Sequence, residues 1–356
     1  MAYRRRLVTA LALCACFVFP SGFARSYNIS LKGRVHERLT RLAELCLERS
    51  SSRMPTDCDA RTIPAGRTMG GWRNDLTLSS RWADDPTRQI GGLSGIKFAI
   101  SAGRNCRTWF RGGDGSDAPY GGLLCSSHYG PLQFWHAMRS SETESAAETR
   151  AKMLEWVDVT YRVATGRISE TEGYCSYFRS RPAIARAMVP DNFPYCAPRP
   201  GLQNDGAGYQ AWRVLTLFSM RCSNPISSTT CTEIVGSGGT ALARRNARGA
   251  LLHIVQDSFS QSHAVRGSAV TGRHFGARIV CLPITSFHFY TAQVASGVDH
   301  GSADKYPTVD GATCGPGRLI DDPVTASAVM LWHVNTNSDP EVVQAYFRDR
   351  VLGSGG

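Results

Sequence analysis

The chain has 356 residues, and 42% of them are hydrophobic, which is enough to bury a sizeable core in one large domain or two ordinary ones. This composition excludes an intrinsically disordered chain, although 35 Gly and 17 Pro make it rich in loops. The formal charge of +11, from 40 Lys and Arg against 29 Asp and Glu, favours anionic partners such as phosphate esters, nucleic acid or anionic lipid. No segment is apolar for long enough to predict a transmembrane helix.

The first 24 residues have the pattern of a secretory signal peptide. Three arginines at 4–6 form the positive region, residues 7–19 the apolar region, and residues 22–24 offer small side chains for cleavage. The two cysteines inside the apolar region loosely resemble a lipoprotein cleavage box, which is the less favoured alternative. We therefore expect a secreted or periplasmic protein whose mature domain comprises residues 25–356.

The remaining ten cysteines predict a disulfide framework. An even number of cysteines in an exported chain is typical of disulfides, and no C-x-x-C pair is present to suggest a cysteine zinc site. Pairing each cysteine with its sequence neighbour is the default expectation, since each bond would then close a short or moderate loop. These pairs are Cys46–Cys58, Cys106–Cys125, Cys175–Cys196, Cys222–Cys231 and Cys281–Cys314.

The hydrophobic pattern predicts helices along most of the chain. Apolar residues recur at helical spacing in residues 33–49, and His36 lies in the first turn of this helix. A loop follows, and then the segment Trp-Ala-Asp-Asp, in which Asp84 and Asp85 stand before a helix-breaking Pro86. Residues 87–125 are rich in glycine and resemble a disulfide-closed insertion.

A second group of helices is expected from residue 127 onwards. Ser127 is a suitable cap for a helix that has His128 at its start, and the helix over 145–165 is closed by Gly166. Further helices are expected at 207–222, 240–264, 322–335 and 339–352, with a short extended segment within 280–290. Pro and Gly leave no room for a regular series of strands, so we predict a single all-α domain.

The helix over 240–264 carries the most informative polar residues. His253 and Asp257 are four residues apart and therefore project from the same face, as two ligands of one metal ion do. His263 lies roughly 240° further round an ideal helix at ~100° per residue, so it would not easily reach the same ion. It is either an unrelated histidine or a ligand of a second metal. His300 and Asp304 repeat the four-residue spacing.

Each of these residues has an ordinary explanation when it is taken alone. An isolated H-x3-D pair arises by chance, and His36 is equally suited to a helix surface. The carboxylates of Asp84 and Asp85 can cap a turn, and His128 can be a hydrogen-bonded core histidine. The order in which all of them occur along the chain is the more specific signal.

That order resembles the zinc-dependent phospholipase C and fungal single-strand nuclease superfamily, over roughly residues 33–305. Its members have a His in the first helix, an Asp in a W-x-D-like segment, a His at a helix start, H-x3-D-x5-H, and finally H-x3-D or H-x3-E. The residues that match this pattern are His36, Asp84, His128, His253, Asp257, His263, His300 and Asp304.

The resemblance implies an all-α domain built round two or three zinc ions. The residues matching Asp84, His128, His253 and Asp257 surround one zinc, those matching His263, His300 and Asp304 hold another, and a third is shared by Asp257, His36 and the N-terminal residue. Members of the best-known type begin with a Trp that this chain lacks, which leaves the third ion open. Asp85 is an alternative to Asp84 as ligand.

The expected activity is hydrolysis of a phosphoric diester by metal-activated water. Asp84 or Asp85 would orient or deprotonate that water. Trp109, Phe110 and Arg107 lie in a loop that is suited to stacking a base or touching a membrane surface. A phospholipase C-like enzyme is favoured, because the segment from His253 to His263 is closer to that branch. A single-strand-type nuclease is the alternative, and a non-catalytic secreted binding protein with a degenerate metal site is the alternative of another class.

Overall fold

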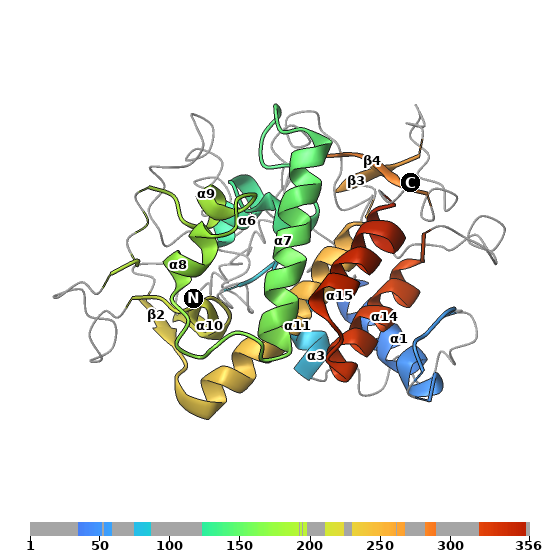
Figure 1. The fold of residues 1–356 in the computed structure, drawn as a ribbon, viewed down its shortest axis with the longest axis horizontal. Helices are drawn as coiled ribbons and strands as arrows, with labels where there is room; N and C mark the ends of the chain where they lie inside the picture. The colour runs from blue at the N-terminus through green and yellow to red at the C-terminus, as the bar shows by residue number, and fades with distance from the viewer. Residues whose placement is uncertain are drawn as a thin grey trace, which may run out of the picture.

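The protein is mostly helical, as predicted, and carries two small two-stranded antiparallel sheets (Figure 1). The computed structural model describes residues 35–51, 53–58, 75–86, 123–191, 193, 195–197, 211–223, 230–260, 262–267, 282–289 and 320–353. Within these ranges, no helix is both long enough and apolar enough to cross a membrane.

The elements follow one another along the chain with short connections in each described range. The helices before the centre of the fold are α1 (Val35–Arg49), α3 (Asp75–Ser79), α6 (Leu123–Tyr129), the 3-10 helix η4 (Gln133–His136), α7 (Ala146–Ala164), α8 (Tyr174–Arg179), α9 (Ala185–Met188) and α10 (Val214–Ser219). The later ones are α11 (Gly236–Asp257), α14 (Pro323–Thr336), α15 (Pro340–Tyr346) and the π-helix η6 (Phe347–Leu352). Strand β1 (Met220–Ser223) pairs with β2 (Thr230–Glu233), and β3 (Ala264–Arg266) pairs with β4 (Ile284–Phe287).

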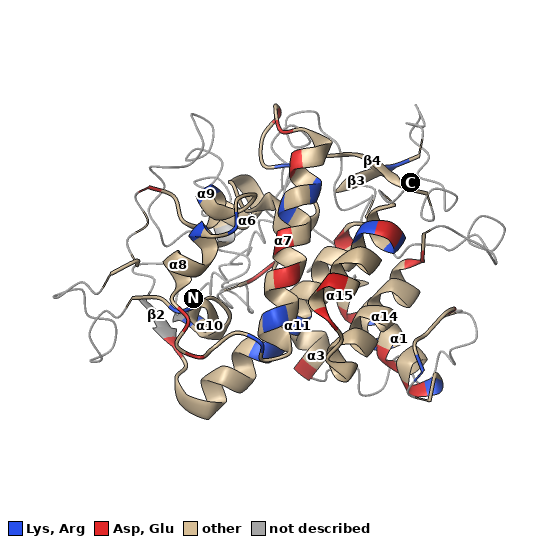
Figure 2. Ribbon diagram, in the orientation of Figure 1, with Lys and Arg blue, Asp and Glu red and all other residues tan. Residues whose placement is uncertain are grey.

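Helix α11 is the centre of the described fold. It packs against α7, α10, α3 and α14, and Figure 1 shows it crossing behind α7. Leu251, Leu252, Ile254 and Val255 have no exposed surface, since they lie in the end of α11 that these helices pack against. Charged residues of both signs lie along α1 and α7 (Figure 2), whereas α11 carries three arginines in its first half and one acidic residue, Asp257, at its end.

An aromatic cluster fills the space between α7, α10 and the turn after α3. Trp135 stacks on Trp156 with ring centroids 4.7 Å apart, and Trp82 lies 5.2 Å from Trp135 and 4.8 Å from Phe218. All three indoles are buried. Because Trp82 and Trp135 precede Asp84 and His136 closely in sequence, this packing fixes the backbone from which those two side chains project.

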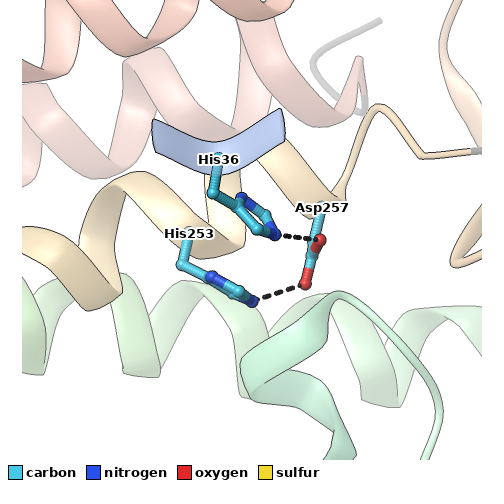
Figure 3. Close-up of side chains that lie close together, drawn as sticks. All are labelled: His36, His253 and Asp257. Carbon is cyan, nitrogen blue, oxygen red and sulfur yellow. Dashed lines mark ion pairs between the residues drawn. The ribbon is translucent and has the colours of Figure 1, made fainter. Parts of the chain in front are cut away.

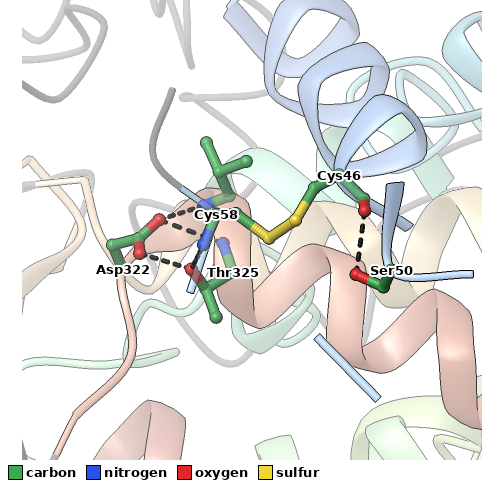
Figure 4. Close-up of a disulfide and its surroundings, with 6 residues drawn as sticks. Cys46, Ser50, Cys58, Asp322 and Thr325 are labelled. Carbon is green, nitrogen blue, oxygen red and sulfur yellow. Dashed lines mark hydrogen bonds between the residues drawn. A yellow bond between two sulfur atoms is a disulfide. The ribbon is translucent and has the colours of Figure 1, made fainter. Parts of the chain in front are cut away.

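Helices α1 and α14 pack side by side, although they lie at opposite ends of the described chain. A disulfide between Cys46, on α1, and Cys58 holds the segment after α1 next to the start of α14 (Figure 4). The Cys58 N–H donates to Thr325 Oγ1 at 3.0 Å. Asp322 caps α14 by accepting hydrogen bonds from the N–H groups of Val324 and Thr325.

Close backbone contact joins α11 to α3 at Gly249. A Cβ atom added to Gly249 would lie only 2.0 Å from the carbonyl oxygen of Ser79, so only glycine permits this approach. The contact is one helical turn before His253, and it sets the turn after α3 directly against the end of α11.

The structure confirms several of the predicted elements. Helix α7 begins at a capping box formed by Ser145 and Glu148, and Gly166 follows it with a φ of 73°. The Cys46–Cys58 and Cys175–Cys196 disulfides pair as expected. Cys125 is also disulfide-bonded, and Cys222 lies directly opposite Cys231 in the β1–β2 register. Cys106, Cys281 and Cys314 lie outside the described residues.

Other predicted boundaries were wrong. Of the helix expected over 207–222, the described residues 211–222 are helical only at 214–219, and strand β1 then begins because its residues pair with β2. The helix expected to start at Ser127 instead ends at Tyr129, so His128 is in its last turn. Helix α11 ends at Asp257 and not near residue 264, because the chain turns there into β3.

Candidate metal centre

The last turn of α11 presents His253 and Asp257 on one face (Figure 3), as their four-residue spacing predicts. The Nε2 atom of His253 lies 2.8 Å from Oδ2 of Asp257. The Nδ1–H of His253 donates to the carbonyl oxygen of Ser80, 2.8 Å away in the turn after α3. Since that carbonyl can only accept, the lone pair of the neutral ring belongs to Nε2, which faces the carboxylate.

Helix α1 brings His36 to the other oxygen of the same carboxylate. His36 Nε2 lies 3.3 Å from Asp257 Oδ1, and its ring stacks on that of His253 with centroids 3.9 Å apart. The His36 Nδ1 atom is 2.8 Å from Oε1 of Gln256, whose amide group donates to Thr40 Oγ1 at 3.0 Å. Gln256 therefore directs the lone pair of neutral His36 towards Asp257, as a carbonyl does for many metal-binding histidines.

Helix η4 contributes His136, which the sequence analysis did not select. Its Nδ1 atom lies 3.0 Å from Asp257 Oδ2, 3.0 Å from His253 Nε2 and 3.9 Å from Asp84 Oδ1. The remaining contact, between His253 Nε2 and Asp84 Oδ1, is 3.7 Å. Four atoms from four different positions in the chain thus surround one small space.

The five contacts between these four atoms are close in length to the ligand separations round a tetrahedral ion, although Asp84 and Asp257 belong to different groups of potential ligands. A zinc with bonds of ~2.0–2.1 Å has ligand atoms ~3.3 Å apart, and the five contacts between these side chains span 2.8–3.9 Å. Asp84, His136 and His253 form one group of potential metal ligands, and His36, His253 and Asp257 form a second. The two oxygens of Asp257 face different histidines, so this carboxylate is placed to bridge two ions.

His263 also lies near the Asp257 carboxylate. Helical geometry does not predict this position, because His263 lies beyond the end of α11. Because α11 ends at Asp257, the chain turns after it: the backbone N–H of His263 donates to the carbonyl oxygen of Ser260, and His263 Nδ1 lies 3.3 Å from Asp257 Oδ2. The same Nδ1–H donates to the carbonyl oxygen of His136 at 2.5 Å. The prediction that His263 continues the same helix was therefore wrong. Its Nε2 remains the lone-pair nitrogen of the neutral ring, and its role as a ligand of a second ion stays a prediction.

The centre is buried and its electrostatics favour positive charge. Although burial alone would lower the pKa of His253, the carboxylates of Asp257 and Asp84 raise it to about 9. Burial would raise the pKa values of both carboxyl groups, but the surrounding histidines hold that of Asp84 below its usual value and that of Asp257 well below. Burial lowers the pKa of His136, which favours a neutral ring.

Two ionised carboxylates in a buried space need compensating charge. Asp84 is 1% exposed and Asp257 is fully buried, and among the described residues Asp257 Oδ1 accepts no hydrogen bond. Isolated buried charges are costly, so such groups are paired or coordinate metals in folded proteins. One divalent cation would balance the charge of both carboxylates while the imidazoles stay neutral.

The remaining predicted residues fall into two groups. His128 and Asp85 lie beside the centre: His128 has its ring 4.8 Å from that of His136 and Nδ1 3.0 Å from Ser127 Oγ, and Asp85 is half-buried next to Asp84. The second group lies outside the described residues and comprises His300, Asp304, Arg107, Trp109 and Phe110.

His136 was missed because one short apolar segment contains two histidines, His128 and His136, and either could match the expected ligand position. Both follow the cysteine at 125, and the sequence analysis chose His128 as the residue at a helix start. Gly130 and Pro131 separate the two and end α6, so that His136 belongs to a different element. This Gly-Pro break was the available signal. Comparisons of the chain with protein-family models, with curated proteins and with solved structures found no match.

Proposed function

We propose that this chain is a secreted, zinc-dependent hydrolase of phosphoric diesters, most similar in action to phospholipase C. The observation that supports it best is the set of four atoms from Asp84, His136, His253 and Asp257, whose contacts fall at 2.8–3.9 Å in a buried space. Their order in the sequence resembles that of a superfamily with this activity, with His136 replacing His128.

Zinc suits this donor set better than other common divalent ions. Mg²⁺ and Ca²⁺ prefer oxygen ligands in larger coordination numbers, whereas imidazole nitrogen with one or two carboxylates is typical of zinc. The Nδ1–H groups of His36, His253 and His263 each point to an oxygen atom, which is the arrangement that orients metal-binding histidines. We propose two or three ions, with Asp257 between two of them.

The chemistry proposed for the centre follows from these ligands. Zinc ions bound there would lower the pKa of a water molecule towards ~7 and neutralise charge on the phosphoryl oxygens. Asp84 is ionised at neutral pH, since the neighbouring histidines lower its pKa, and it can therefore accept a hydrogen bond from the attacking water. Asp85, which is half-buried beside it, is the alternative acceptor. The tight packing of Trp82 and Trp135 keeps this part of the centre in place.

Metal analysis of the purified full-length protein tests the proposal. We expect two or three zinc ions per chain, and His253→Ala should lose at least one of them. His333→Ala is the matched control, because this buried histidine hydrogen-bonds to Ser338 and belongs to neither group of potential metal ligands. Protein that is purified without chelator and contains no zinc would contradict the proposal and favour a non-catalytic binding protein.

Two substrate assays then choose between the activities. The zinc-loaded protein is incubated with phosphatidylcholine vesicles and, separately, with single-stranded DNA, each with and without a chelator. Chelator-sensitive release of phosphocholine supports the phospholipase C-like activity. Chelator-sensitive cleavage of DNA alone would support the nuclease alternative, and the absence of both reactions in a zinc-loaded chain would leave only a binding function.

A further inference from the structure

The amide group of Gln256 connects the metal centre to two helices other than α11. Its Oε1 atom lies 2.8 Å from His36 Nδ1, and its Nε2 atom donates to Thr40 Oγ1 at 3.0 Å. Ser327 Oγ lies 3.5 Å from the same Nε2 atom. Thr40 belongs to α1 and Ser327 to α14, which pack side by side, so both helices contact one amide nitrogen.

Burial makes the hydrogen-bond partners of this amide important. Thr40, Gln256 and Ser327 have no exposed surface, and His36 is 1% exposed. The amide nitrogen carries two N–H groups, and an N–H that is buried without an acceptor costs free energy. The two hydroxyl oxygens therefore favour the observed orientation, in which the nitrogen points to Thr40 and Ser327 and the oxygen points to His36.

The orientation of the amide determines which nitrogen of the neutral His36 ring carries the proton. The amide oxygen can only accept, so with Oε1 facing Nδ1 the proton stays on Nδ1 and the lone pair on Nε2. A reversed amide would turn its N–H groups towards Nδ1, and the proton would then belong to Nε2. That atom lies 3.3 Å from Asp257 Oδ1, which accepts no hydrogen bond among the described residues (Figure 3). A proton on Nε2 would thus block the ion that His36 and Asp257 could hold.

We propose that Thr40 is a positioning residue of the metal centre, which holds the Gln256 amide so that His36 keeps its Nε2 lone pair for a metal ion. This inference rests on the proposed function, because it requires an ion between His36 and Asp257. Thr40 lies four residues after His36, and the two residues therefore share a face of α1. The ligand and the hydroxyl that orients it thus belong to one rigid element.

The zinc affinity of the full-length protein, measured by competition with a chelating dye, tests the inference. Thr40→Val keeps the shape of the side chain but removes the hydroxyl, and we expect it to weaken the binding of one zinc ion per chain ~10-fold. Thr40→Ser keeps the hydroxyl and should recover most of the affinity. Thr160→Val is the matched control, because Thr160 is equally buried and its hydroxyl donates to the backbone carbonyl of Trp156. Its zinc affinity should equal that of the wild type.

NMR of the metal-free protein gives a second measurement that does not depend on zinc. Long-range ¹H–¹⁵N correlations at pH 8.5, about two units above the ordinary pKa of histidine, identify the protonated nitrogen of each ring. His36→Gln assigns the His36 signals. We expect the proton of His36 on Nδ1 in the wild type and in Thr40→Ser, and a share of it on Nε2 in Thr40→Val.

Each other outcome has a defined meaning. Unchanged zinc affinity in Thr40→Val, or a proton on Nε2 of His36 in the wild type, would overturn the inference and leave the proposed function intact. Equal losses of affinity in Thr40→Val and Thr40→Ser would also overturn it, because the hydroxyl would not be the cause. Wild-type protein that takes up no zinc would contradict the proposed function itself, and the inference would fall with it.

Discussion

The two halves of α11 differ in how much of their surface is buried. In residues 236–248 the buried positions recur every three or four residues, and Arg244, Arg245 and Arg248 reach outwards. In residues 249–257 every residue is buried, including His253, Gln256 and Asp257. A single helix thus changes from amphipathic to fully enclosed at Gly249.

This difference places the polar residues of the two halves in different surroundings. The arginines of the first half reach solvent or a surface ion pair, and its buried Asn246 donates a hydrogen bond to the carbonyl oxygen of Phe218. The polar side chains of the second half are buried, so each must be satisfied by a neighbour or by a bound ion. Burying these polar groups in the second half costs folding free energy, and it fixes their donors and lone pairs in one arrangement. A metal centre requires such a fixed arrangement. Substitutions in the two halves should have effects of different size and kind.

The largest effect is expected for Asp257→Asn. The substitution keeps the shape of the side chain but removes the charge that lies next to four histidines. We expect loss of at least one zinc ion per chain and a fall in hydrolysis of ~100-fold or more, measured by metal analysis and substrate turnover. Asp75→Asn makes the same change at an exposed position and should be neutral. Full zinc content in Asp257→Asn would show that the carboxylate is structural.

A smaller effect is expected for Gln256→Leu, which leaves His36 without the acceptor for its Nδ1–H. Loss of such orienting partners typically weakens metal binding ~10- to 100-fold. We predict a decrease in zinc affinity of this size in a competition assay with a chelating dye. Gln256→Glu keeps an oxygen acceptor at the position and should bind zinc more tightly than the leucine variant. Equal affinities in both variants would refute the orienting role.

Gly249→Ala should reduce both stability and metal binding, because its Cβ would collide with Ser79 at the point where α3 rests on α11. Overpacking of this kind costs about 1–3 kcal/mol, which thermal unfolding can detect as a lower Tm. Gly238→Ala is the internal control, since a Cβ there meets nothing within 4 Å and alanine favours the helix by about 0.5–1 kcal/mol. The comparison fails if both variants change Tm in the same direction.

The smallest effect is expected in the exposed half, for Arg245→Ala. Arg245 pairs with Asp75, and the Asp75 side chain is 75% exposed. Exposed ion pairs contribute about 0–1 kcal/mol and are screened by salt. Zinc content and turnover should be unchanged, and Tm should shift only slightly. A loss of zinc from this variant would mean that the two halves of α11 are not independent.

Much of the fold could be predicted from the sequence because local signals and packing agree. The capping box at Ser145, Gly166 and the proline-led starts of α14 and α15 define helix ends through interactions within a few residues. The sequence predicted a longer helix than α10, because the pairing of residues 220–223 with β2 overrides their local preference for a helix. The end of α11 was misplaced for a related reason, since β3 gains its partner β4 about twenty residues later in the chain.

The site was predicted as far as one helix face could define it. His253 and Asp257 share a face of α11, which spacing alone reveals, whereas the position of His263 depends on a turn that a helical wheel does not represent. The choice between His128 and His136 depends on how η4 packs against Trp156 of the next helix, α7, and local sequence does not reveal this contact between two elements. Sequence order thus indicates the chemistry, while tertiary packing decides which of two neighbouring histidines takes part.

The packing of α1 against α14 has a consequence for how the protein matures. His36 comes from the first described helix, and α1 lies against a helix nearly 300 residues later, with Cys58 and Thr325 in contact across a separation of 267 residues. Contacts between residues so far apart in sequence form late in folding, because other contacts must first offset the entropy lost when the long intervening loop closes. The contact between α1 and α14 can therefore form only after α14 has been synthesised. We expect the His36 side of the centre to be completed after that step. Under the proposed function, we therefore expect metal to bind at that side only after translation.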